Sequence, residues 1–350
     1  MTNSKPKPVA FITGVTGQDG AHLANLLIAK GYEVYGGFRR GSANKTWRTD
    51  YFGITEQIKL VEFQLNEPQN LIEILQRIKP DEIYNLAGES FVSDSFKYPS
   101  VTLDANVHGT LNILEAVRLI SPETRMFFAS SSEIFGRNNA GKILKEDSSC
   151  QPSNPYAISK LTADYFIKLY RERYGLFACS GILFNHEGPL RGPQFVPRKI
   201  TYNIARIKMN GGEAIELGNL NAARDWGSAF DYVEAMRLML SLDQPQDFIV
   251  ATGKLSTVRE LLYFSASVAG FDPVFEGEGI NEICVDKVTG KQIAKIAARY
   301  FRPNDASQLA GDPTNIEDAT GWSRSRSFND MIEEMVMVDV DRWRRGVVGE

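Results

Sequence analysis

The amino-terminal part of the sequence places a glycine-rich turn between a short apolar run and a helical pattern. Residues 9–13 predict a strand, and the pattern at residues 22–30 predicts a helix. Between them stand Gly14, Gly17 and Gly20, in the spacing G-x-x-G-x-x-G. Glycines let the backbone pass close to a pyrophosphate, and the amides that open a helix carry partial positive charge. Such spacing alone would indicate only a tight turn, but between a strand and a helix it predicts a dinucleotide-binding unit.

Strand and helix patterns continue to alternate up to about residue 130. Apolar runs predict strands at residues 33–38, 58–63, 82–87 and 125–129, and helical patterns lie between them at residues 68–78 and 100–119. Strands that alternate with helices build a parallel sheet with helices on both faces. We therefore predict an α/β fold with a Rossmann-type doubly wound parallel sheet.

The composition argues against several other classes of protein. The 350 residues are 43 % hydrophobic and 23 % charged, as in ordinary soluble globular proteins. The formal net charge of -4 argues against nucleic acid as a partner. Cys150, Cys179 and Cys284 lie far apart without metal-ligand spacing, so no metal site is predicted. Neither a signal-peptide pattern nor an apolar run of roughly 20 residues occurs, so we expect no membrane partner and a cytoplasmic location.

The end of the second predicted strand indicates which dinucleotide would bind. Sites that prefer NAD usually carry an acidic residue there, which binds the free ribose hydroxyl. This chain has Arg39, Arg40 and Ser42 instead. Two arginines and a serine suit a 2′-phosphate by charge and hydrogen bonding, so we predict NADP. The alternative interpretation is a solvated basic turn.

A tyrosine and a lysine stand four residues apart where another helix is predicted to begin. Tyr156 and Lys160 would share one face of that helix. An ammonium close to the phenol favours the phenolate, so the tyrosine could act as a base near neutral pH. A single pair with this spacing is weak evidence for catalysis.

Polar residues also follow the strand predicted at residues 125–129. The sequence continues with Ser130, Ser131, Ser132 and Glu133. Ligands of doubly wound sheets bind beyond the carboxyl ends of the strands, so these side chains are expected in the ligand crevice. Serines at a strand end are also common turn-formers. The carboxylate beside them, together with the Tyr–Lys pair, favours a catalytic site.

Several motifs together resemble one family. The glycine turn Gly14-Val-Thr-Gly17-Gln-Asp-Gly20, the segment Tyr84-Asn-Leu-Ala87, and the pairs Ser131-x-Glu133 and Tyr156-x-x-x-Lys160 resemble the extended short-chain dehydrogenases/reductases that act on nucleotide-diphospho sugars. Later motifs are similar to the GDP-mannose 4,6-dehydratase branch, namely Gly181-Ile-Leu-Phe-Asn-His-Glu187, Arg191-Gly192, Arg198-Lys-Ile200, Leu217-Gly-Asn219, Arg224-Asp-Trp-Gly227, Ala251-Thr-Gly253 and Tyr300-Phe-Arg-Pro303. The resemblance runs from about residue 9 to about residue 340.

The resemblance implies a reaction and four catalytic residues. Tyr156 would remove the proton from the hydroxyl on sugar carbon 4 as a hydride passes to NADP, and Lys160 would lower the pKa of Tyr156 and bind the nicotinamide ribose. Ser131 would hydrogen-bond the same hydroxyl. Glu133 would take the carbon 5 proton while water leaves from carbon 6, where the hydride then returns. The implied enzyme is an NADP-dependent GDP-sugar 4,6-dehydratase, a lyase that converts GDP-mannose to GDP-4-keto-6-deoxymannose.

The resemblance also implies contacts to both ligands. The expected cofactor contacts are Gly14, Thr16, Gly17, Gln18, Asp19, Gly20, Arg39, Arg40, Ser42, Gln64, Leu65, Leu86, Ala87, Tyr156, Lys160 and His186. The expected substrate contacts are Ser90, Asn185, Arg191, Lys199, Arg224, Arg302 and Asp305. Arg224 and Arg302 are expected to clamp the substrate pyrophosphate, the alternative for each arginine being a surface ion pair.

Some positions depart from the family pattern. Gln64 replaces a carboxylate that faces adenine, although an amide oxygen can accept the same hydrogen bond. Glu89 stands where the family often has a Gln or Met close to the sugar. A GDP-manno-heptose 4,6-dehydratase therefore remains an alternative, as does a GDP-sugar epimerase or reductase. Epimerases typically lack an acid at the position of Glu133, so the presence of Glu133 favours a dehydratase. The dTDP-glucose branch typically has an acid where Ser132 stands, so Ser132 favours the GDP-sugar branch.

The sequence also predicts the domain organisation and the assembly. Residues 1–187 and about 226–252 are expected to form the NADP-binding Rossmann domain. About 188–225 and 253–343 are expected to form a smaller mixed α/β domain that binds the nucleotide sugar. The resemblance implies a homodimer or homotetramer, with residues 39–48 near the cofactor of a neighbouring subunit.

Overall fold

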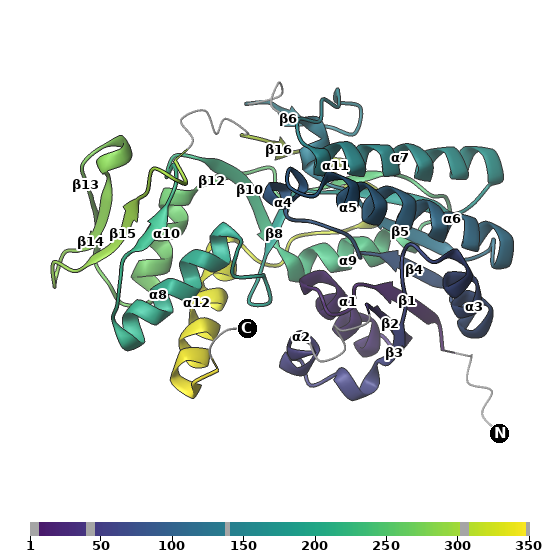
Figure 1. Cartoon of the computed structure of the whole chain (residues 1–350), viewed down its shortest axis with the longest axis horizontal. Helices are drawn as coiled ribbons and strands as arrows, with labels where there is room; N and C mark the ends of the chain where they lie inside the picture. The colour runs from purple at the N-terminus through teal and green to yellow at the C-terminus, as the bar shows by residue number, and fades with distance from the viewer. Residues whose placement is uncertain (1–6, 40–45, 137–140, 302–307, 348–350) are drawn as a thin grey trace.

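A parallel sheet of seven strands dominates the computed structural model, which describes residues 7–39, 46–136, 141–301 and 308–347 (Figure 1). The strands lie side by side in the order β11 (Phe248–Val250), β7 (Ala178–Leu183), β5 (Arg125–Ala129), β4 (Glu82–Asn85), β1 (Val9–Thr13), β2 (Glu33–Phe38) and β3 (Lys59–Glu62). Every neighbouring pair is parallel. The predicted Rossmann-type sheet is confirmed.

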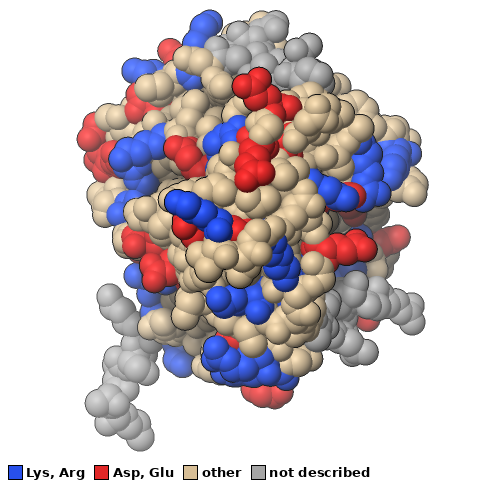
Figure 2. Space-filling model, turned by 90° about the vertical axis from the view of Figure 1, so that its left-hand side faces the viewer, with Lys and Arg blue, Asp and Glu red and all other residues tan. Residues whose placement is uncertain are grey.

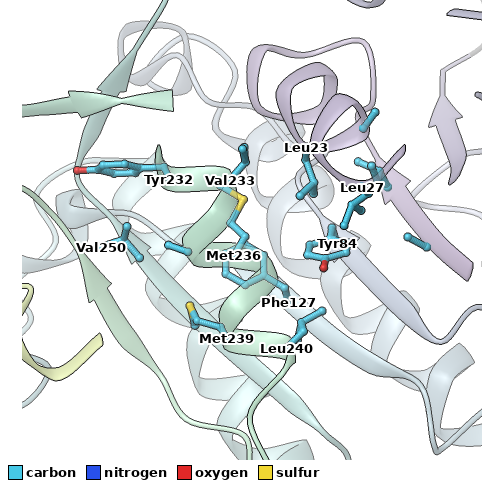
Figure 3. Close-up of a cluster of buried hydrophobic side chains, with 14 of the residues drawn as sticks. Leu23, Leu27, Tyr84, Phe127, Tyr232, Val233, Met236, Met239, Leu240 and Val250 are labelled. Atoms are coloured by element: carbon cyan, nitrogen blue, oxygen red, sulfur yellow. The ribbon is translucent and has the colours of Figure 1, made fainter. Parts of the chain in front are cut away.

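Alternation along the strands divides the core into two layers. In β1, Ala10 and Ile12 contribute to one buried cluster, while Phe11 contributes to the cluster on the opposite face. The layer that contains Ile12 is covered by α1 (Gln18–Ala29) and α9 (Ala229–Leu240), with α11 (Thr314–Thr320) at its side. Figure 3 shows Leu23 and Leu27 of α1 and Met236 and Met239 of α9 against Tyr84 and Phe127 of the sheet.

Three helices cover the other face of the large sheet. They are α3 (Pro68–Ile78), α6 (Gly109–Ile120) and α7 (Pro155–Tyr174). The helix before α6 begins as α5 (Pro99–Leu103) and passes through a π-helical turn, η2 (Asp104–His108), without a break. Asn106 in this turn binds the backbone of Glu89 through two 3.0 Å hydrogen bonds. The turn therefore fixes the segment after β4.

A separate hydrophobic cluster lies in the part of the chain drawn on the left of Figure 1. A four-stranded sheet in the order β13 (Pro273–Glu276), β14 (Ile283–Asp286), β15 (Gln292–Ile296), β9 (Ile215–Leu217) packs there with helices α8 (Val196–Asn210), α10 (Val258–Val268) and α12 (Phe328–Arg345). The division of the chain into two domains remains a prediction.

The remaining elements among the described residues are short. They are the three-stranded sheet β12 (Leu255–Thr257), β10 (Ala223–Ser228), β8 (Asn185–Glu187), the pair β16 (Ala310–Gly311) and β6 (Ile143–Leu144), helices α2 (Trp47–Tyr51) and α4 (Val92–Ser95), and turns η1 (Thr55–Gln57), η3 (Ser132–Phe135) and η5 (Gly279–Asn281). Figure 2 shows basic and acidic side chains interspersed on the face that includes β13, β14 and β15. Within the described ranges, no helix is both long enough and apolar enough to span a bilayer.

Candidate active site

A cleft of about 920 Å³ opens at the carboxyl ends of β1, β2, β4 and β5. It brings together most of the residues predicted from the sequence: Gly14, Thr16, Gly17, Gln18, Asp19, Gly20, Arg39, Gln64, Leu65, Leu86, Ala87, Ser90, Ser131, Glu133, Tyr156, Lys160, Asn185, His186, Arg191 and Arg224. Residues more than two hundred positions apart thus share one cavity, as expected for a ligand site in a doubly wound sheet.

The glycine turn closes tightly around the start of α1. Gly14 has φ +72°, and its amide donates to the carbonyl of Gly37 at 3.1 Å. A Cβ on Gly20 would lie 2.3 Å from the Gly14 carbonyl oxygen, so the helix reaches the strand only with glycine there. Thr13 Oγ1 accepts from the amides of Leu86 and Ala87 at 3.0 Å, which joins this turn to the end of β4.

An ion pair links the first turn of α1 to β8. His186 Nε2 lies 2.9 Å from Asp19 Oδ2, and Gln18 Nε2 donates to the carbonyl of His186 at 3.1 Å. Burial by itself would raise the pKa of Asp19, but the charge of His186 and its hydrogen bond lower it well below the usual range. The same pairing raises the pKa of His186 against the opposing effect of burial. A negative charge is therefore held at the amino end of α1.

Tyr156 lies buried in the cleft beside Ser131 and Glu133. Burial raises the pKa of Tyr156 to about 12, and a hydrogen bond with Ser131 and the charge of Arg191 act in the opposite direction. Ser131 Oγ also accepts from the amide of Glu133 at 3.3 Å and so caps η3. One short turn thereby presents the hydroxyl and the carboxylate to the phenol.

Lys160 does not produce the lowered pKa of Tyr156 that was predicted. Its Nζ donates to the carbonyl of Ala129 at 2.8 Å and lies 5.9 Å from the centre of the Tyr156 ring. Burial lowers the pKa of Lys160 to about 8, with Asp164 acting in the opposite direction. Burial of the phenol therefore raises its pKa, although Tyr156 and Lys160 stand one helical turn apart.

Asn154 orients Glu133, a contact that was not predicted from the sequence. Its Oδ1 accepts from the amide of Ala157 at 2.8 Å and caps α7, while its Nδ2 donates to Glu133 Oε2 at 3.0 Å. An Asn before Pro155-Tyr156 is a recognisable helix start, so the cap could have been predicted from the sequence. The contact to Glu133 depends on the tertiary fold.

The arginines of the cleft have partners in the protein. Arg191 Nε lies 3.0 Å from Glu187 Oε2, and its guanidinium lies 3.6 Å from the centre of the Phe195 ring. Burial raises the pKa of Glu187, and the charge of Arg191 acts in the opposite direction. Arg39 lies 3.4 Å from Glu89 in an exposed ion pair, and Arg224 donates to the carbonyl of Ala223 at 2.9 Å.

A few predicted residues lie elsewhere. Lys199 is not part of the cleft lining; its Nζ donates to the carbonyl of Glu216 at 2.7 Å. Arg40, Ser42, Arg302 and Asp305 lie outside the described residues. Among the described residues, no group of three or more His, Cys, Asp or Glu is placed to hold a metal ion.

Comparisons with known proteins identify relatives over nearly the whole chain. The sequence profile of a family described as GDP-mannose 4,6 dehydratase matches residues 11–335. The GDP-mannose 4,6-dehydratase of Vibrio cholerae is 42 % identical over 351 residues, which cover 95 % of this chain and 94 % of that protein. The human GDP-mannose 4,6 dehydratase is 41 % identical over 348 residues, covering 97 % and 93 %.

A solved structure shares the fold at lower identity. The UDP-glucose 4-epimerase of Thermotoga maritima, solved with UDP-glucose, superimposes with a TM-score of 0.81 and 20 % identity, covering 97 % of this chain and 99 % of that one. This likeness supports the extended Rossmann architecture described above.

Proposed function

Because the chain belongs to the GDP-mannose 4,6-dehydratase family, we propose that it converts GDP-mannose to GDP-4-keto-6-deoxymannose with loss of one water. The observation that carries this proposal is the position of Glu133. Its carboxylate shares the cleft with Tyr156, Lys160 and Ser131. A carboxylate is the additional base that an elimination requires beyond the Tyr–Lys pair of a simple oxidation.

Each of the four residues has a proposed role in that reaction. Tyr156 removes the proton of the hydroxyl on carbon 4, and Ser131 holds that hydroxyl through a hydrogen bond. The positive charge of Lys160 favours the phenolate as it forms. Glu133, held by Asn154, takes the proton from carbon 5, which is acidic beside the new ketone, and passes it to the hydroxyl of carbon 6, which leaves as water.

We propose NADP as the cofactor. When bound, NADP takes a hydride from carbon 4 and returns it to carbon 6, so no net oxidation occurs. The residues fit a dinucleotide because the glycine turn brings the first residues of α1 to the cleft, and Gln64 and Leu65, which the family resemblance places near adenine, line the same cleft. Arg39 at the end of β2, where NAD sites carry an acid, supports the phosphorylated form.

The test compares two sugars in parallel. The protein is incubated with NADP and either GDP-mannose or GDP-manno-heptose, and product mass is followed together with absorbance of NADPH. We expect GDP-mannose to lose one water, about 18 mass units, with no lasting NADPH signal. Loss of water only from the heptose would name the other sugar. Unchanged mass with both, or stoichiometric NADPH turnover, would favour the epimerase or reductase instead.

We also propose a homodimer formed through the face of α5 and α7. Val101 on α5 and Ile158, Tyr165 and Leu169 on α7 are all exposed, and the last three recur at helical spacing. The two helices pack side by side (Figure 1), so a second copy could complete a bundle. Sedimentation should show a dimer or a multiple of it, and Tyr165→Glu should shift the population towards monomer. A monomeric native protein would contradict this assembly.

The cytoplasmic location remains a prediction.

A further inference from the structure

We propose that Arg48 is a positioning residue that couples the cofactor turn to the substrate side of the cleft, an inference that rests on the function proposed above. Arg48 lies on α2 and joins two loops. Its Nη1 donates to the carbonyl of Thr16 at 2.9 Å, and its Nε donates to the carbonyl of Leu190 at 2.8 Å. Thr16 belongs to the glycine turn, and Leu190 directly precedes Arg191 of the cleft.

The guanidinium is suited to hold both carbonyls at once. Its donors lie in one rigid plane and point in different directions, whereas a lysine ammonium is a single centre on a flexible stem. The Trp47 ring lies 4.3 Å from the guanidinium carbon and supports that plane. Arg48 therefore sets a distance between the two loops, and a conservative Lys cannot reproduce it.

Two further arginines, Arg198 and Arg342, bind the same loop. Arg198 and Arg342 each donate to the carbonyl of Pro189 at 2.7 Å, and Arg198 also donates to the carbonyl of Arg191 at 3.1 Å. Together with Arg48, they engage all three successive carbonyls from Pro189 to Arg191. The loop is therefore attached to helices α8 and α12 and cannot easily move alone.

One buried carboxylate binds both of these arginines. Asp339 Oδ2 accepts from Arg198 Nε at 2.9 Å and from Thr201 at 2.8 Å, and its Oδ1 accepts from Arg342 at 3.1 Å. Arg198 and Asp339 are both fully buried. A buried pair of this kind is rigid, because breaking it leaves an uncompensated charge. Arg48 thus connects the glycine turn to a firmly built support.

The consequence is a coupling between the two ligands. A dinucleotide that orders the glycine turn holds Thr16, and through Arg48 it also fixes the position of the Arg191 loop, together with α8 and α12, relative to that turn. Binding of one ligand then removes part of the ordering cost for the other, which is positive coupling. By reciprocity, the nucleotide sugar must tighten cofactor binding by the same factor.

The test measures this factor without turnover. NADPH already carries the hydride and cannot accept another, so GDP-mannose binds beside it unreacted. The dissociation constant of NADPH is measured by its fluorescence on the full chain, without and with saturating GDP-mannose. We expect the sugar to tighten NADPH binding at least about fivefold in the wild type. Arg48→Met should bring that factor close to one, and Arg48→Lys should lower it clearly.

Arg171→Met is the matched control. Arg171 is another largely buried arginine that donates to a carbonyl, that of Ala178 at 3.0 Å, and it pairs with Asp247 away from the cleft. This variant should lower the melting temperature but retain the coupling factor. A wild-type factor near one, or an Arg48→Met factor equal to that of the wild type, would overturn the inference. If Arg48→Met does not fold, Arg48→Lys decides in the same way.

The two proposals fail separately. Absence of water loss from GDP-mannose in the wild type would overturn the proposed function. The coupling factor would then be measured with GDP, which presents the same nucleotide and pyrophosphate, and a factor near one there would overturn the role of Arg48 as well.

Discussion

The carboxylate of Glu133 can be separated experimentally from its position in the cleft. In Glu133→Gln, the amide oxygen can still accept the hydrogen bond from Asn154, but the side chain is no longer a base. We expect turnover to fall by about 100-fold or more, since general bases typically contribute factors of 10² to 10⁴. In deuterium oxide, the wild-type product should carry deuterium at carbon 5, and the variant should incorporate it at the reduced rate.

Glu146→Gln serves as the control for this change. Glu146 also accepts a hydrogen bond from an asparagine side chain, that of Asn315 at 2.6 Å, but it is not part of the cleft lining. Its variant should turn over substrate at the wild-type rate. Full activity of Glu133→Gln would remove Glu133 from the mechanism.

The burial of Lys160 predicts an alkaline limit to activity. Burial lowers its pKa to about 8, and the carboxylate of Asp164 opposes that shift. The ammonium form is the one that assists Tyr156, so kcat/KM should fall as pH rises through about 8. Asp164→Asn removes the opposing charge and should move this limit to lower pH. The pH profiles of both proteins provide the test, and a limit that stays in place or moves upward would contradict the assignment.

At the scale of elements, the start of α7 serves both stability and chemistry. Asn154→Ala removes the cap and should lower the free energy of unfolding by about 1 kcal/mol. It also releases Glu133, so turnover should fall beyond what the stability change explains. Ser327 caps α12 in the same manner but lies far from the cleft, so Ser327→Ala should lose similar stability and keep full activity. Urea unfolding and turnover are measured on both variants, and equal activity losses would contradict the dual role.

At the scale of the whole molecule, His22 makes stability depend on pH. Burial lowers its pKa to about 4, with Asp19 acting in the opposite direction. The unfolded chain takes up a proton near pH 6.5 and the folded protein only near pH 4, so stability falls as pH decreases through this window. His22→Gln lacks this titration. The free energy of unfolding of His22→Gln minus that of the wild type should therefore rise by about 2 kcal/mol when the pH is lowered from 7.5 to 5. A difference in urea unfolding that is independent of pH would contradict the buried neutral state.

Much of the fold follows from local patterns in the sequence. Alternating strands and helices predict the parallel sheet, and Gly20 predicts the close approach of α1 to β1, because only glycine fits there. The cleft residues at the strand ends follow from the same topology, since the carboxyl ends of parallel strands meet at one edge. The family assignment rests on motifs that are equally local.

Other features were decided only by the tertiary structure. The raised pKa of Tyr156 comes from burial, which helical spacing from Lys160 does not reveal. Lys199 binds the Glu216 carbonyl rather than lining the cleft. Arg48 meets Leu190 across 142 positions of the chain, and nothing near either residue indicates the other. Local sequence thus determined the elements and the order in which they bring chemistry to the sheet edge. Desolvation and long-range hydrogen bonds depend on how those elements pack, so the charge state and orientation of the side chains were determined by the folded molecule.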